Sequence, residues 1–412
     1  MSRRVLLHVG TPKTGTSYLQ DVLFRNRAQL LKHGISYPAD RFDAQFLAAL
    51  DLMRLRWGGL EQDAVGAWDL LAQRIRDHDG TSIISHEILA TASRTQVARA
   101  LESLGHQPGG DTSDGGTEVH LILSVRDLVR QIPAEWQENV KHRAAFRYAR
   151  FLELIRDPER SHRVGAWFWG VQEIPDILAR WGADIPPERI HLVTVPPADG
   201  PKDELWRRFS LAFGLDDLDL DLGTERSNPS LGVPESALIR RINRAAARDL
   251  SPAHYRPLVR ELLAHRTFSK RTGSPRLGLP PDLYPWVREL TGSWIAELTE
   301  KKYDVIGDLE DLRGAPRPTG PFVDPDRPPP RQVNNAAIDA IKALLLEAAH
   351  RQAENERLRL ELEDARREII RARTPRLMRS MEWTVRRLES NDTGRKALGV
   401  YRMARGRNSR SA

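Results

Sequence analysis

The chain has 412 residues, 40% of them hydrophobic and 29% charged, which is the composition of a globular protein with one large domain and extensions. It contains no cysteine, and this excludes disulfides, zinc–thiolate sites and thiol nucleophiles. The formal net charge of +7 is concentrated in residues 371–412, where 12 Lys and Arg stand against 3 Asp and Glu; the residues before them carry a net charge of −2 and give no reason to expect nucleic-acid binding.

The N-terminal apolar run breaks at Gly10, which makes it too short for the core of a signal peptide. No stretch of the sequence has the length needed to span a bilayer. We therefore predict a cytoplasmic protein.

Four short runs rich in Val, Ile and Leu lack the polar alternation of half-exposed strands, which favours strands buried on both faces. Helical patterns separate these runs, and strands that alternate with helices are typical of a parallel α/β sheet. The sequence thus predicts a three-layer α/β sandwich with a central parallel sheet. The predicted strands are Val5–Val9, Ser82–Ser85, Val119–Val125 and Arg189–Val195, and the helices are Ser17–His33, Leu60–Asp77, Arg94–Leu104 and Pro133–Asp157.

The C-terminal part of the chain has a different composition. Residues 314–331 contain 7 prolines, so we predict an α/β domain over residues 1–313 and a proline-rich linker over 314–333. A helix is expected over 334–372, where apolar residues at 3–4 spacing allow either a short coiled coil, which would make the protein a homo-oligomer, or a single solvated helix. The basic tail, 373–412, is either an amphipathic helix for an anionic membrane surface or an acidic partner, or a disordered segment.

The strongest motif is GTPKTGTS, Gly10–Ser17, which lies between a predicted strand and a predicted helix. A glycine-rich turn that enters a helix offers free backbone N–H groups and the positive end of the helix dipole to an anion. The nucleoside triphosphatase loop has its lysine directly after the second glycine. Here Thr16 occupies that position and the lysine, Lys13, precedes Gly15.

The segment HVGTPKTGTSYLQ resembles the 5′-phosphosulfate loop of bacterial sulfotransferases that use 3′-phosphoadenosine-5′-phosphosulfate (PAPS). The segment Val119–Glu138 resembles the second signature of that family, in which an arginine at the end of a strand binds the 3′-phosphate; here that residue is Arg126. A serine that often follows eight residues later is replaced by Ala134. The resemblance implies that Lys13 is catalytic and that the donor is bound by Pro12, Lys13, Thr14, Gly15, Thr16, Ser17, Tyr18 and Arg126, with Arg226 and Asn228 from a later loop.

Removal of a proton from the acceptor requires a base at the carboxyl end of a neighbouring strand. The segment IISHEIL offers His86 and Glu87, and the resemblance slightly favours Glu87. If the strand stays extended there, the two side chains point to opposite faces and one of them is a bystander.

The sequence therefore predicts a PAPS-dependent sulfotransferase without a metal, acting on a hydroxyl or amine of a carbohydrate or lipid-linked glycan. Two alternatives remain: a P-loop phosphotransferase that uses ATP or GTP, and a non-catalytic domain that binds nucleotide or glycan.

Overall fold

The structure is a computed structural model that describes residues 4–112, 115–201, 203–223, 230–373 and 376–408. The chain forms two compact units, Met1–Ile341 and Lys342–Ala412.

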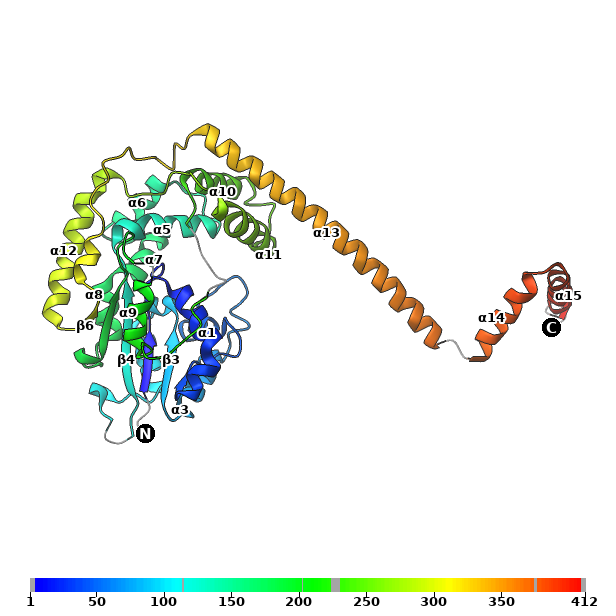
Figure 1. Cartoon of the computed structure of the whole chain (residues 1–412), viewed down its shortest axis with the longest axis horizontal. Helices are drawn as coiled ribbons and strands as arrows, with labels where there is room; N and C mark the ends of the chain where they lie inside the picture. The colour runs from blue at the N-terminus through cyan, green and yellow to red at the C-terminus, as the bar shows by residue number, and fades with distance from the viewer. Residues whose placement is uncertain (1–3, 113–114, 202, 224–229, 374–375, 409–412) are drawn as a thin grey trace. The chain divides into compact units, whose positions relative to one another are not determined.

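In the described part of the chain, six parallel strands form one sheet in the order β2-β3-β1-β4-β5-β6, flanked by helices (Figure 1). All four predicted strands are present, and the α/β prediction with a central parallel sheet is confirmed. The short edge strands β2 and β6 were not predicted. The strands are β1 (Arg4–His8), β2 (Ile35–Ser36), β3 (Thr81–Ser85), β4 (Glu118–Val125), β5 (Ile190–Thr194) and β6 (Asp304–Ile306).

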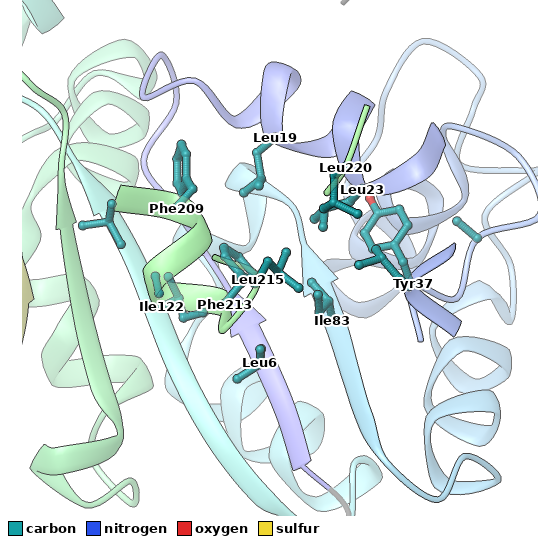
Figure 2. Packing of buried hydrophobic residues seen from close by; sticks show 14 residues of the cluster. Leu6, Leu19, Leu23, Tyr37, Ile83, Ile122, Phe209, Phe213, Leu215 and Leu220 are labelled. Carbon is teal, nitrogen blue, oxygen red and sulfur yellow. The ribbon is translucent and has the colours of Figure 1, made fainter. Parts of the chain in front are cut away.

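The core on one face of the sheet explains why the strand sequences are apolar at successive positions. Leu6 of β1, Ile83 of β3 and Ile122 of β4 point from this face into one buried cluster (Figure 2). They meet Leu19 of α1 and Phe209 of α9, both fully buried. The neighbouring strand positions face the opposite side and are also buried, as expected for a sheet covered on both faces.

The helices alternate with the strands along the chain. In unit 1 they are α1 (Thr16–Lys32), α2 (Ala44–Met53), α3 (Ala67–Arg76), α4 (Arg94–Ser103), α5 (Leu128–Lys141), α6 (Tyr148–Arg156), α7 (Arg163–Gln172), α8 (Ile174–Trp181), α9 (Glu204–Phe213), α10 (Val233–Ala245), α11 (Pro252–Tyr255) and α12 (Tyr284–Lys301), with a π-helix at Arg256–Thr267. The long helix α13 (Pro330–Arg373) begins in unit 1, and α14 (Arg376–Glu389) and α15 (Asp392–Asn408) follow it.

The single helix predicted over Pro133–Asp157 is wrong. Helix α5 begins at Leu128 because the Asp127 carboxylate caps it, accepting a 2.9 Å hydrogen bond from the Arg130 N–H. The helix ends at Lys141, where Arg143 adopts a left-handed conformation with φ of 77°, and α6 starts only at Tyr148. The helix predicted over Leu60–Asp77 also begins later, at Ala67.

The proline-rich segment lies against the α/β domain. Pro325 and Pro328 are buried, and the Asp326 carboxylate accepts hydrogen bonds from the Tyr148 and Ala149 N–H groups, at 3.1 and 3.0 Å. These contacts cap the start of α6. Helix α13 begins at Pro330, four residues earlier than the sequence indicated, with Val333 buried in unit 1.

Unit 2 consists of the rest of α13 with α14 and α15. The helix α13 exposes many large apolar side chains, among them Leu345, Leu358, Leu362 and Ile369. Trp383 of α14 and Tyr401 of α15 are exposed as well. None of the described helices combines the length and the apolar character needed to cross a bilayer.

Candidate functional site

The turn between β1 and α1 is shaped by residues that few other side chains could replace. Lys13 lies in the left-handed region with φ of 66°, and Gly15 has φ of 93°. A Cβ on Gly15 would come within 2.7 Å of Leu205 Cδ2, and one on Gly10 within 2.4 Å of Ser124 Oγ. A tight turn that exposes successive backbone amides is the geometry of an anion-binding nest.

The N-terminus of α1 is open to an anion. Its N-cap, Gly15, has no side chain to cap the helix, and its first turn contains no acidic residue. The first N–H groups of a helix have no acceptor within the helix, so those of Thr16, Ser17 and Tyr18 point toward the turn. With the helix dipole they provide several donors for one phosphate.

A buried network supports this turn from below. His8 is fully buried, and its ring nitrogens hydrogen-bond to Ser85 Oγ at 2.8 Å and Ser124 Oγ at 2.9 Å, which links β1 to both neighbouring strands. Ser124 Oγ also contacts Thr14 Oγ1 at 2.7 Å. Burial lowers the pKa of His8 to about 4, so the ring is neutral at physiological pH. His8 therefore has a structural role beneath the site.

Lys13 does not point into open solvent, because its ammonium group forms an ion pair with the Glu138 carboxylate of α5. The side chains of both residues are less than one fifth exposed. Burial alone would raise the pKa of Glu138, but Lys13, followed by His142 and Lys141, holds it well below its ordinary value. The lysine of the motif, Lys13, therefore already binds an anion, the Glu138 carboxylate.

Arg126 lies at the carboxyl end of β4, next to the same turn. One of its terminal nitrogens donates a 3.1 Å hydrogen bond to the Lys13 carbonyl. Its Nε is buried and has no hydrogen-bond partner among the described residues. No described carboxylate forms an ion pair with Arg126. Burial, and then the charge of Arg130, lower the pKa of Arg126 to about 10, so it stays charged at neutral pH.

The simple alternative, that Arg126 pairs with Asp127, does not hold. Asp127 forms its ion pair with Arg130, which also donates to the Val195 and Pro196 carbonyls at 3.4 and 3.0 Å. Arg130 therefore has a structural role. A partly buried guanidinium whose Nε has no partner is unfavourable without an anion, which suits Arg126 to bind one.

Ala134 itself supplies no side-chain hydroxyl where the family often has a serine. Gln131, one of the residues that could compensate, donates instead to the Pro12 carbonyl and to Gln172. Arg226 and Asn228 lie outside the described residues. The end of their loop is held on α5, where Leu231 and the Gln137 side chain exchange two hydrogen bonds of 2.9 and 2.8 Å.

His86 and Glu87 follow β3, which ends at Ser85. Glu87 begins a short 3₁₀ turn, so the strand does not stay extended and the two side chains approach each other, with His86 Nδ1 3.9 Å from a Glu87 oxygen. Glu87 accepts hydrogen bonds from Gln20, at 3.0 Å, and from Thr16, both on α1. It therefore lies beside the start of α1, next to the turn.

The hydrogen bonds of His86 and Glu87 indicate different protonation states for the two side chains. His86 Nδ1 accepts the Ile88 N–H at 3.2 Å and burial lowers the pKa of the ring, so the neutral ring carries its proton on Nε2 and has no free lone pair there. Burial would raise the pKa of Glu87, but His86, Gln20 and Thr16 together hold it below its ordinary value. Glu87 is thus an ionised carboxylate at neutral pH.

The aromatic side chains near the turn have different environments. Tyr18 is partly exposed and meets Trp206 of α9 edge to face, with ring centroids 6.3 Å apart. Phe168 and Trp169 are buried, as expected for core residues, but Trp167 is only partly buried. The described residues contain no group of three or more His, Asp or Glu side chains arranged to hold a metal ion.

Sequence reasoning missed Glu138, although the segment quoted for the second motif ends on it. Gln131, Glu135, Glu138 and His142 recur at spacings of 4, 3 and 4 residues, which places them on one face of a helix. Gln131 contacts Pro12 and Glu138 contacts Lys13, so this polar face of α5 is the face that meets the turn. That spacing is the signal that could have identified Glu138.

No protein-family model matches the chain, and no curated protein matches it significantly. Among solved structures, the chain is similar to a sulfotransferase from Alicyclobacillus acidocaldarius, with 16% identity and a TM-score of 0.37 over 63% of this chain and 96% of that one. A similarity at this level assigns no role to any residue, so the site has to be interpreted from its own chemistry.

Proposed function

We propose that this chain is a sulfotransferase that uses PAPS and transfers the sulfuryl group to an acceptor hydroxyl or amine. The observation that carries the proposal is the pairing of two anion sites at one edge of the sheet. Arg126 is partly buried and has no carboxylate partner among the described residues. It hydrogen-bonds to the backbone of Lys13, in the turn that leads into the uncapped helix α1. A donor with phosphates at its 3′ and 5′ positions needs two such sites.

The residues present fit this donor. Arg126 offers a buried, unpaired Nε for a phosphate, and the turn from Pro12 to Ser17 offers amides and hydroxyls around Gly15. The Glu138 carboxylate on Lys13 stands in for the anion that the lysine would otherwise hold. Tyr18 supplies a partly exposed ring beside the turn for an adenine base.

When bound, PAPS supplies an activated sulfuryl group on a phosphate leaving group. Lys13 would stabilise the negative charge that develops on the leaving oxygen, and the amides at the start of α1 would hold the phosphate. Glu87, ionised and positioned by Gln20 and Thr16, would accept the proton of the acceptor hydroxyl. Glu138 would position Lys13 before the donor binds.

The test is calorimetric titration of the whole chain with adenosine 3′,5′-bisphosphate, and separately with ATP and magnesium. We expect the bisphosphate to bind, and Lys13→Met to weaken it by about 10- to 100-fold, since a hydrogen bond to a charged group contributes about 1.5–3 kcal/mol. Lys32→Ala, at the exposed far end of the same helix, is the matched control and should bind as the parent does.

Binding of ATP and magnesium without binding of the bisphosphate would replace this proposal by a phosphotransferase. If neither compound bound, a non-catalytic domain would be the better interpretation.

A further inference from the structure

An aromatic cluster that the proposed chemistry does not use is connected to Lys13 through His142 and Glu138. We call Phe46 of α2, Trp57 of the α2–α3 loop and Trp167 of α7 the aromatic wall. Trp57 is its centre, with ring centroids 5.7 Å from Phe46 and 6.3 Å from Trp167. All three rings are only partly buried, whereas tryptophans of the core such as Trp68 are fully buried. Partly exposed rings gathered in one place are a common lining of ligand sites.

The loop that carries Trp57 is built to hold it in place. The Glu61 carboxylate accepts hydrogen bonds from the N–H groups of Trp57 and Gly59, at 2.8 and 2.9 Å. Gly58 and Gly59 both have positive φ, and open space surrounds the position of a Cβ at each. The turn is therefore closed by its own hydrogen bonds, and it holds the indole ring against three helices.

A chain of contacts joins the aromatic wall to both catalytic candidates. The Trp57 ring lies 6.2 Å from the His142 ring, and His142 contacts Glu138, the partner of Lys13, at 3.2 Å. On the other side, Phe46 stacks on His86 with centroids 5.0 Å apart, and Glu87 follows His86 directly. The wall thus extends from His142, which contacts the partner of Lys13, to His86, which precedes the candidate base. The proposed reaction requires its acceptor between Lys13 and Glu87.

A cation without a close partner borders the same place. Arg260, on the π-helix Arg256–Thr267, approaches Glu138 only to 3.8 Å, which is beyond hydrogen-bond distance. Its Nε is buried and has no hydrogen-bond partner in the part of the chain that the structure describes. π-helical segments are rare and are frequently found at functional sites. Arg260 is therefore available to an incoming anion.

The local charges leave an excess of positive charge around Glu138. Lys13, Lys141 at 3.7 Å and Arg260 face this one carboxylate. Burial raises the pKa of Glu135 to about 7, so this neighbour is only partly ionised at neutral pH. Once Lys13 holds the donor, Glu138 still faces Arg260, which it approaches only to 3.8 Å.

We propose that the acceptor site lies between the aromatic wall and Arg260, and that it takes a ring-containing acceptor with a negative charge of its own, an acidic glycoside. The ring packs on Trp57, and the acidic group pairs with the Arg260 guanidinium. This inference rests on the proposed sulfotransferase function and adds the class of acceptor to it.

The experiment compares 4-nitrophenyl β-D-glucuronide with 4-nitrophenyl β-D-glucoside, which differ in the carboxylate. Each is titrated into the whole chain, with and without saturating adenosine 3′,5′-bisphosphate. We expect the glucuronide to bind about tenfold more tightly, since a charge-assisted contact contributes about 1.5 kcal/mol or more. Arg260→Gln should abolish this preference, and Arg260→Lys should keep part of it.

Two controls separate charge from folding. Arg256→Gln removes an arginine whose side chain is 66% exposed on the same π-helix, and it should keep the preference. Trp57→Ala should weaken both glycosides alike. Bisphosphate affinity should be unchanged in all these variants, and its absence in the parent would refute the proposed function itself.

Equal binding of the two glycosides, binding of neither, or a preference that survives Arg260→Gln would overturn the acceptor proposal. If Arg260→Gln did not fold, the comparison of the two glycosides on the parent chain would still decide it.

Discussion

Replacement of Arg126 by methionine should make the free protein more stable and its donor site much weaker. The reason is that Arg126 is partly buried with its Nε fully enclosed, remains charged, and has no carboxylate partner among the described residues. Such a group opposes folding unless an anion is bound. Methionine keeps an unbranched chain that fills the same space and removes the charge.

The magnitude follows from the pKa. Lowering the pKa of Arg126 to about 10 corresponds to a cost of about 3 kcal/mol for its charged form in the fold. The hydrogen bond to the Lys13 carbonyl offsets about 1.5 kcal/mol of this cost. The free energy of unfolding of Arg126→Met should therefore rise by about 1 kcal/mol, while the affinity for adenosine 3′,5′-bisphosphate should fall about 100-fold with the loss of a charge-assisted contact.

Urea unfolding measures the first effect and calorimetry the second. Arg130→Met is the matched control, because Arg130 pairs with buried Asp127 and with two carbonyl groups. It should lose about 3 kcal/mol of stability and keep most of its bisphosphate affinity. An Arg126→Met variant that is less stable than the parent and still binds the bisphosphate normally would refute the reasoning, because Arg126 would then be a structural residue.

Three further predictions concern other parts of the chain. The pKa of His8 in the fold, about 4, lies below its unfolded value, so the folded state is favoured fully above the unfolded pKa and less as the pH falls. Urea unfolding should therefore show that the free energy of unfolding falls by about 2 kcal/mol between about pH 8 and pH 5, and His8→Gln should not show this loss. Glu87→Gln should slow sulfuryl transfer to the glucuronide about 10²- to 10⁴-fold and His86→Asn far less, and the opposite order would make His86 the base. If α13 forms a coiled-coil homodimer, light scattering should show a dimer that Leu362→Glu dissociates. Leu360→Glu should leave the dimer intact, because Leu360 lies off the 3–4 spacing of apolar residues. A monomeric parent chain would contradict this prediction.

The central part of the fold could be predicted because its strands are buried on both faces. Such strands need apolar residues at successive positions, and the runs at Val5–Val9 and Val119–Val125 supply them. The edge strands Ile35–Ser36 and Asp304–Ile306 are too short to leave a pattern. The predicted start of α5 is wrong because proline is typical of the first turn of a helix, whereas Pro133 lies inside α5 and the cap at Asp127 sets the start.

The candidate site could be predicted only in part. The turn Gly10–Ser17 and Arg126 are local features, each recognisable from a few consecutive residues next to a strand. Glu138, Trp57 and Arg260 come from different elements, and their proximity depends on how α5, the α2–α3 loop and the π-helix pack. In a single sequence, no regular spacing of residues indicates that these elements are close together. The polar face of α5 is the exception.

Three features that oppose folding lie close together at the turn between β1 and α1. Lys13 is a non-glycine residue in the left-handed region, which costs about 1 kcal/mol or more. The Nε of Arg126 is buried and unpaired, and α1 begins without a side-chain cap. None of these features improves the packing of the sheet, and a better folded protein would have a glycine, an apolar residue and a serine there. They have a common explanation if a doubly anionic ligand binds, because one molecule would then neutralise Arg126, cap α1 and replace Glu138 on Lys13.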